Sequence, residues 1–268
     1  MLDAVTLTGD MSKSDIPSAV VKSAGRVLQI LEFFDAVQRE ARVTEISRVL
    51  RYPQSSTSVL LRSLVDMGYL QHDRYQRSYF PTRRVSLLGN WVDPALVQQG
   101  RLLAQANELA SEIRHTVLLA TANGLNAQYI YVSRAVPRAT EPAPAGIGQL
   151  RPIAATAVGK ALLSNLSGDH VSKLIRRINA ERADAEPVVN AAELVAELSL
   201  GRRRGYFAGA GAGAGQWGMA TALPCERQLL AIGIEAPADD MANDSDRLAA
   251  MLRNFVGEIA AERLEMTG

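Results

Sequence analysis

Short polar side chains open the stretch YPQSSTSVLLRSLVDMGYL, residues 52–70. Gln54 can bond to adenine edges, Ser55 and Ser58 to bases or phosphates, and Arg62 to a phosphate or a guanine. Within this stretch no carboxylate, which would repel phosphates, occurs before Asp66. Such side chains at a helix start suit a recognition helix in the major groove of DNA. A merely solvated helix start is the alternative, and this helix alone does not decide between them.

Apolar spacing predicts two short helices that would position these side chains. In the first helix, Ile46, Val49 and Leu50 form one stripe, and Thr44 is the expected N-cap. That helix should end before Pro53, because proline disfavours helical geometry in the preceding residue. The apolar stripe of the second helix consists of Thr57, Leu60, Leu61, Leu64, Val65 and Met67. Gly68 can supply the left-handed residue that closes this helix.

Two further elements flank the helix pair. Residues 69–72 and 78–80 read as strands around the turn Asp73–Arg77, which predicts a wing. Arg74 and Arg77 at its tip are placed to meet phosphates or a minor groove. Upstream, helical spacing over 20–37 leaves Lys22 and Arg26 outside the apolar stripe, where they can touch the DNA backbone. Solvated charges are the alternative for all four. The predicted DNA-contacting residues are Thr44, Gln54, Ser55, Ser56, Ser58, Val59, Arg62, Arg74, Arg77, Lys22 and Arg26.

Composition and charge narrow the class of protein. The chain has 268 residues, enough for two domains, with 47% hydrophobic and 21% charged residues. No apolar run approaches the ~18 residues of a membrane span, and no secretory signal opens the chain, so we expect a cytoplasmic protein without membrane contact. One cysteine, Cys225, excludes an internal disulfide. Residues 39–84 carry nine arginines and four acids, a net charge of +5 that leaves −4 for the remainder of a chain of net charge +1. A basic segment on an acidic remainder suits a DNA module joined to a sensing module, although +5 is also compatible with a solvated surface.

Two motifs in the right order carry a family resemblance from Val21 to the C-terminus. VKSAGRVLQILEFF, VTEISRVL and YPQSSTSVLLRSLVDMGYL resemble the winged helix-turn-helix of the IclR family of bacterial transcription regulators. LRPIAATAVGKALLS resembles the signature of that family's effector domain. The resemblance implies an α+β fold: an N-terminal winged helix-turn-helix domain, a linker helix that also helps to pair subunits, and a C-terminal α/β GAF-like effector-binding domain.

The expected domains follow from this resemblance and from the pattern of the chain. Residues 1–17 form a mobile arm, 18–90 the winged helix-turn-helix domain with its linker near 88–94, and 91–268 the effector-binding and oligomerisation domain. In the second domain, strands are expected at 116–121, 128–134, 217–223 and 229–235, and Phe207 adds strand material. Helices are expected at 156–166, 171–178, 191–204 and 241–265.

The effector site is implied by the resemblance alone. In the family, a small organic acid lies against the sheet, near the start of the signature helix and the late strands. The corresponding residues here are Ala157, Val158, Gly209, Ala210, Gly218, Gly233 and Glu235. Glycines replace the usual polar donors, and Glu235, if it points inward, would repel a carboxylate. Three hypotheses follow: a larger, more apolar ligand fills the space that the glycines vacate, a cationic ligand pairs with Glu235, or the domain only oligomerises.

Enzyme-like motifs fail on their spacing. Gly159-Lys160 lacks the earlier glycine and the following Ser or Thr of a phosphate loop, where Ala154 and Ala161 stand. The repeat at 209–215 formally matches a dinucleotide fingerprint, but strand-like sequence follows it, so a Gly-Ala hairpin is expected. His72, His115, His170 and Cys225 show no spacing for a metal or a nucleophile, and we expect no cofactor.

These observations predict a transcriptional regulator, not an enzyme, that binds a near-palindromic operator as a dimer or a dimer of dimers and responds to a small organic or aromatic metabolite. The alternative is an enzymatic or ligand-binding α/β protein whose N-terminal helices contact other proteins. Where the family often has an arginine before the Leu60-Leu61 pair, this chain has Val59. Val59 removes one phosphate contact and offers methyl groups to a thymine, so we expect an operator unlike those of arginine-bearing members.

Overall fold

A computed structural model describes residues 21–88, 101–134, 146–184, 187–213, 215–224 and 229–267, with side chains up to residue 261. The chain divides into two compact units, Met1–Gln98 and Gln99–Gly268. The expected N-terminal arm (1–17) and most of the expected linker (88–94) lie outside the described residues. Among the residues that are described, no helix combines the length and the apolar character that a bilayer span needs.

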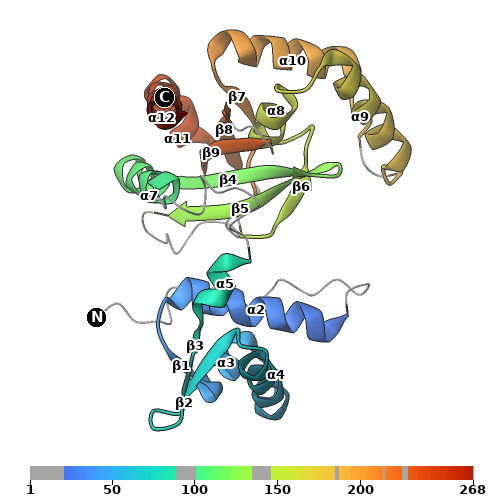
Figure 1. Cartoon of the computed structure of the whole chain (residues 1–268). Helices are drawn as coiled ribbons and strands as arrows, with labels where there is room; N and C mark the ends of the chain where they lie inside the picture. Colours follow the sequence, from blue (N-terminus) through green and yellow to red (C-terminus); the bar gives the residue numbers. More distant parts are fainter. Residues whose placement is uncertain are drawn as a thin grey trace. The chain divides into compact units, whose positions relative to one another are not determined.

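The first unit is a winged helix-turn-helix domain (Figure 1). Its elements are α2 (Lys22–Val37), β1 (Ala41–Arg42), α3 (Val43–Leu50), α4 (Gln54–Asp66), β2 (Leu70–Asp73), β3 (Ser78–Pro81) and α5 (Arg83–Leu87). The strands form an antiparallel sheet in the order β1-β3-β2. Apolar side chains from all three of the first helices share one core, in which Ile30, Ile46 and Leu61 are fully buried. The short strand β1 was not predicted, because two residues give no periodic signal.

The end of α4 was predicted correctly, whereas the start of α3 was not. Gly68 has φ +78°, and the Tyr69 amide donates to the Leu64 carbonyl at 2.8 Å, so a left-handed glycine closes α4 as predicted. Thr44 is not the N-cap of α3. The helix begins at Val43 with Arg42 at the cap position, because Arg42 is still paired in β1 and the chain passes directly from strand to helix.

The second unit is an α/β domain built on one six-stranded antiparallel sheet in the order β6-β5-β4-β9-β8-β7. Its elements are α7 (Arg101–Ile113), β4 (Thr116–Asn123), β5 (Asn126–Arg134), β6 (Leu150–Pro152), α8 (Ala157–Leu163), α9 (Gly168–Glu181), α10 (Ala191–Arg204), β7 (Phe207–Ala210), β8 (Gln216–Leu223), β9 (Leu230–Pro237), α11 (Ala238–Asn243) and α12 (Ser245–Thr267). The single helix expected over 241–265 is two helices, because Asp244 has a non-helical backbone (φ −108°, ψ 12°) between them.

Helices cover both faces of this sheet. Helix α8 packs on one face and is backed by α9 and α10, whereas α7 and α12 lie on the other side (Figure 1). Helix α8 begins as the sequence predicts, because the Thr156 hydroxyl accepts from the Gly159 amide at 3.1 Å and caps it. Gly159 also permits close packing: a Cβ there would lie 2.0 Å from the Ile153 carbonyl oxygen. The start of α8 is therefore pressed against the segment that leads into it.

Candidate DNA interface and effector site

The exposed face of α4 carries the side chains that the sequence assigned to DNA. Gln54, Ser55 and Arg62 are exposed, and Val59 remains 60% exposed. Thr57 and Leu61, on the opposite side of the helix, are fully buried. The helix therefore turns a row of hydrogen-bonding groups and one aliphatic side chain outward, and its apolar stripe fixes that orientation.

Two of the predicted serines are less available than the rest. Ser56 and Ser58 are half-buried. The Ser56 hydroxyl donates to the Pro53 carbonyl at 2.9 Å, so its proton is already committed within the turn. Thr44, although no cap, is exposed on α3. The exposed side chains of Arg48 and Arg51, at the end of α3 and in the turn before α4, were not singled out from the sequence.

The tip of the wing presents an aromatic side chain between two arginines. Tyr75 is 99% exposed, and Arg74 and Arg77 are exposed on either side of it. Asp73 Oδ1 accepts from the Tyr75 amide at 2.7 Å and from the Gln76 amide at 3.0 Å, which fixes the turn. Tyr75 was not predicted as a site residue, although its position within the predicted turn could have indicated it.

Arg77 holds a backbone conformation that non-glycine residues rarely adopt. Its φ is +53°, in the left-handed region. Nearby, Arg42 Nε on β1 donates to the Gln76 carbonyl at 3.1 Å, which ties the wing turn to the start of α3. A strained residue that the surrounding contacts hold in place often marks a functional position. An arginine where glycine would fit without strain therefore indicates a function for its side chain.

The two basic residues of α2 lie in different settings. Lys22 is exposed. The Arg26 guanidinium lies 4.7 Å from the centre of the Tyr52 ring, in a cation–π contact, and the Tyr52 hydroxyl donates to Gln29 Oε1. Arg26 therefore helps to join α2 to the turn between α3 and α4. This structural role competes with the predicted phosphate contact.

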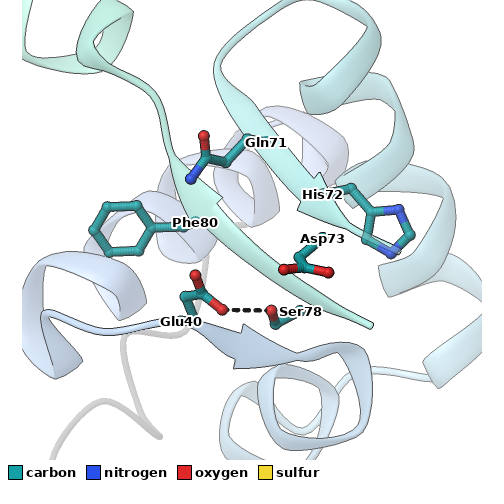
Figure 2. Close-up of a pocket in the computed structure, with 6 residues that line it drawn as sticks. All are labelled: Glu40, Gln71, His72, Asp73, Ser78 and Phe80. Atoms are coloured by element: carbon teal, nitrogen blue, oxygen red, sulfur yellow. Dashed lines mark hydrogen bonds between the residues drawn. The ribbon is translucent and has the colours of Figure 1, made fainter. Parts of the chain in front are cut away.

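A pocket of about 250 Å³ lies on the wing sheet and is lined by Glu40, Gln71, His72, Asp73, Ser78 and Phe80 (Figure 2). In Figure 2 the side chains of Glu40 and Ser78 point toward each other, and the Ser78 hydroxyl donates to Glu40 Oε2 at 2.6 Å. The pocket thus contains two carboxylates, one holding β3 and the other holding the wing turn. Negative charge here disfavours phosphate, so DNA contact is expected from the wing tip and from α4 instead.

In the second unit, strand pairing brings the predicted effector residues together. Gly209 on β7 pairs with Gly218 on β8, and Gly218 pairs with Glu235 on β9. This row continues through Thr116 on β4 to Arg134 on β5. Directly paired residues share a face of the sheet, and here it is the face against which α8 packs. Ala157 and Val158, at the start of α8, are buried against it. Ala210, by contrast, is exposed.

The glycines do not vacate space, so this part of the first ligand hypothesis is wrong. A Cβ at Gly233 would lie 2.6 Å from Val158 Cγ1, and one at Gly218 would lie 3.1 Å from Ala157 Cβ. The absent side chains allow α8 to approach the sheet, and the helix fills the volume that a ligand would otherwise use.

Glu235 points inward and belongs to a buried polar cluster. It is 7% exposed, and its Oε1 accepts from the Tyr129 hydroxyl at 2.9 Å. The Ala212 amide lies near enough to lower the pKa of the same carboxyl group, and the Ala212 carbonyl accepts a hydrogen bond from Arg151 Nη2. Tyr129, Arg151 and Ala212 were not predicted from the sequence, because nothing in the order of the chain links them to Glu235.

Burial and the neighbouring groups act in opposite directions on Glu235. Burial raises the pKa of the carboxyl group above its usual range. The Ala212 amide, the Tyr129 hydroxyl and the charges of Arg151 and Arg134 lower that pKa, but burial outweighs them. Burial likewise raises the pKa of the Tyr129 hydroxyl, and the neighbouring Glu235 raises it further. The phenol therefore stays protonated and acts as a donor.

The enzyme-like motifs take up structural roles. The Gly-Ala repeat joins β7 and β8 as an antiparallel hairpin, as predicted, and opens no helix. Lys160 pairs with Glu197 at 2.8 Å and donates to the Ala208 carbonyl at 3.2 Å, so it is not presented to a phosphate. Within the described part of the chain, no three His, Cys, Asp or Glu side chains gather as a metal site would require.

A winged helix-turn-helix joined in one chain to an α/β domain defines a class of two-domain, DNA-binding transcription regulators. Two family models match within the chain: the IclR helix-turn-helix domain over residues 23–74, and the bacterial transcriptional regulator IclR C-terminal domain over residues 101–261. The chain belongs to the IclR family of bacterial transcriptional regulators.

Individual relatives are distant. The HTH-type transcriptional regulator XynR of Escherichia coli (strain K12) is 23% identical over 70% of this chain and 73% of its own length. The crystal structure of an IclR transcriptional regulator from Alicyclobacillus acidocaldarius has a TM-score of 0.58 at 18% identity, covering 90% of this chain and 98% of that one. An IclR homolog from Microbacterium hydrocarbonoxydans, complexed with 4-hydroxybenzoate, has a TM-score of 0.54 at 19% identity, covering 88% and 97%. These structures support the fold.

Proposed function

We propose that this regulator reads a specific operator through the exposed face of α4, with the wing tip as a second contact. The observation that carries the proposal is the outward row of Gln54, Ser55, Val59 and Arg62, held in place by the buried stripe behind it. Amide, hydroxyl and guanidinium groups can bond base edges, and Val59 can touch a thymine methyl group. Arg74 and Arg77 supply positive charge for phosphates.

The direct test places negative charge on this face. In the double variant Ser55→Glu with Ser58→Glu, two carboxylates meet the phosphates, so we expect DNA affinity to fall by at least about 30-fold, from roughly 1–3 kcal/mol lost at each site. Fluorescence anisotropy against the upstream intergenic DNA, at two salt concentrations and with scrambled competitor, measures the loss.

The matched control adds the same charge elsewhere. Ser172→Glu with Ala196→Glu changes two exposed positions on α9 and α10 in the second unit and should leave affinity unchanged. If the α4 variant still bound the operator like the control, α4 would not be the DNA-reading face. The N-terminal helices would then be assigned to protein contacts, which is the alternative function.

We further propose that two copies bind a near-palindromic operator, since one recognition helix reads only a few base pairs. Pairing of dimers into tetramers extends the same proposal. Because Val59 stands where an arginine contact is common in the family, the preferred half-site should differ from those of arginine-bearing members. Selection from random DNA tests this expectation, and recovery of a shared half-site would contradict it.

We also propose that a small organic metabolite modulates DNA binding from the α8 face of the second unit. A structural neighbour in the family is complexed with 4-hydroxybenzoate, which supports an aromatic or small organic ligand. In this chain α8 fills the space beside Gly218 and Gly233. A ligand that reaches this face must therefore displace α8 or the β7–β8 loop, and binding then favours one arrangement of the domain over another.

A thermal-shift screen of aromatic acids, amines and aliphatic acids tests the effector proposal. A true effector should raise the Tm and also change the anisotropy titration. If no compound of the three classes stabilised the protein, the second unit would be assigned to oligomerisation alone.

A further inference from the structure

The groups around Glu235 are those that a carboxylic acid ligand requires. The Tyr129 hydroxyl on β5 donates to the Glu235 carboxyl group at 2.9 Å. The Ala212 amide in the β7–β8 loop and the Arg151 guanidinium on β6 lie near enough to lower the pKa of that carboxyl group, and Arg151 Nη2 donates to the Ala212 carbonyl. Hydroxyl, amide and guanidinium donors at a buried point are the usual means of binding a carboxyl group. Arg151 retains a further donor, because its Nε is buried without a hydrogen-bond partner. In this protein the carboxyl group in that position belongs to the Glu235 side chain and not to a bound ligand.

We propose that Glu235 is a tethered ligand: it fills, from within the chain, a carboxyl-binding site formed by Tyr129, Ala212 and Arg151, so that free carboxylic acids do not enter that site in the native protein. The inference rests on the proposed effector role of this face and narrows its ligand class. An effector of the native protein then has no carboxyl group at this position. Loss of the Glu235 side chain converts the site into a receptor for small carboxylic acids.

Ala212 links the β7–β8 loop to this polar cluster. Residues 208–215 are only glycine and alanine, so the loop has no large side chain to anchor it. Ala212 is buried, its carbonyl accepts a hydrogen bond from Arg151 Nη2, and its amide lies near enough to Glu235 to lower the pKa of that carboxyl group. Removal of Glu235 leaves Arg151 as the remaining contact of this kind. The loop should then open readily and admit a small molecule.

Glu235→Ala removes a fragment equivalent to acetate, which makes acetate the probe. In carboxylate-free buffer, the variant should melt below the wild type. For a Kd of about 10 mM, 100 mM sodium acetate should raise its Tm by roughly 3–6 °C. The wild type should show no more shift than in equal sodium chloride. Benzoate, which is too large for the vacancy, should act weakly.

Three variants and one cationic compound separate a carboxyl site from a general cavity effect. Glu235→Gln keeps the volume filled and should not respond to acetate. Ile232→Ala opens a cavity on the same strand at another fully buried position and should not respond either. In the Glu235→Ala background, Tyr129→Phe removes the donating hydroxyl and should weaken acetate binding by about fivefold, the value of one hydrogen bond. Ethylammonium chloride should not replace acetate.

Two results would overturn the proposal. One is a Glu235→Ala protein whose Tm is indifferent to acetate. The other is a wild-type protein that acetate stabilises and that loses this response with Tyr129→Phe, because Glu235 would then not fill the site. Should Glu235→Ala fail to fold, Glu235→Ser is titrated in its place, since its hydroxyl keeps a partner for Tyr129, and the same outcomes decide.

Anisotropy with operator DNA separates this inference from the proposed effector role. An acetate-dependent Tm together with acetate-dependent DNA affinity in Glu235→Ala supports both. An acetate-dependent Tm with unchanged DNA affinity supports the carboxyl site and contradicts the effector role. An acetate-independent Tm overturns the carboxyl site, whatever the DNA affinity does.

Discussion

Arg77 combines a backbone cost with an exposed charge. Its left-handed φ of +53° should cost about 1 kcal/mol relative to glycine. We expect Arg77→Gly to raise the unfolding free energy of the winged domain by about that amount and at the same time to weaken DNA binding. The slope of log Kd against log salt concentration should fall by about one, as expected for the loss of one phosphate contact. Chemical denaturation and anisotropy at several salt concentrations measure the two effects.

Arg74→Ala is the matched comparison for that prediction. It removes a neighbouring exposed charge, and φ of Arg74 is not positive. Arg74→Ala should weaken DNA binding without the gain in stability. If Arg77→Gly stabilised the domain but left DNA binding unchanged, DNA contact would not explain why an arginine occupies this strained position.

Glu235 gives stability a pH dependence of definite sign. Its pKa in the folded protein is raised above the unfolded value of about 4.3. The folded state therefore binds the proton more tightly, and this contribution to unfolding free energy is fully present below pH ~4.3 and is lost as pH rises through the folded pKa. The groups that face the carboxyl are Tyr129, Arg151, Arg134 and the Ala212 amide.

Relative to Glu235→Gln, the wild type should therefore lose unfolding free energy as pH rises through this window. Chemical denaturation of both proteins across that range measures the difference. A wild type that gained stability relative to the variant with rising pH would show that the arginines and the hydrogen bonds outweigh burial, contrary to this expectation.

At the scale of elements, the packing of α8 against the segment that precedes it depends on one glycine. A Cβ at Gly159 would lie 2.0 Å from the Ile153 carbonyl oxygen and 2.6 Å from its carbon, and backbone atoms cannot move aside as a flexible side chain can. We expect Gly159→Ala to destabilise the second unit by about 3 kcal/mol, through overpacking. Thermal and chemical denaturation measure the loss.

The same substitution in α12 should have the opposite sign. Gly257 is an exposed helical residue, and a Cβ there meets nothing within 4 Å. Gly257→Ala should therefore stabilise the protein by about 0.5–1 kcal/mol, from helix propensity alone. Equal effects at the two positions would mean that the close contact between α8 and the Ile153 segment does not limit stability.

At the scale of the whole molecule, a dimer on a near-palindrome must match the helical phase of DNA. Half-sites one turn apart, ~34 Å, present the same face of the duplex to both recognition helices. We expect a 5-base-pair insertion between half-sites to reduce affinity by at least about tenfold, and a 10-base-pair insertion to restore part of it. Anisotropy on the three operators measures this phasing. Equal affinity for all three would indicate that the two recognition helices bind independently.

Local pattern was enough to predict most elements of the first unit. The apolar stripes of α3 and α4 indicate which face of each helix is buried, and Pro53 and Gly68 indicate where the two helices end. The turn residues from Asp73 to Arg77 likewise specify the wing. Thr44 was misassigned because the cap position depends on β1, and β1 exists only through its pairing with β3.

The second unit shows why its site was only partly predictable. The resemblance indicated Gly218, Gly233 and Glu235, and the sheet does place them on the face of α8. Whether these residues line a cavity or a packed contact, however, depends on which atoms lie opposite each of them. The glycines suggested an empty pocket, but they allow α8 to approach the sheet closely. The distance between α8 and the sheet decides between these two outcomes.

The family, the order of the two domains and the buried faces of α3 and α4 could all be inferred from the chain alone, because periodicity and turn chemistry act over a few residues. The contact between Glu235 and the Tyr129 hydroxyl, 106 residues away, follows from the three-dimensional fold, as does the place of Ala212 beside both. Those contacts depend on the order β6-β5-β4-β9-β8-β7, which long-range strand pairing sets and no local pattern encodes.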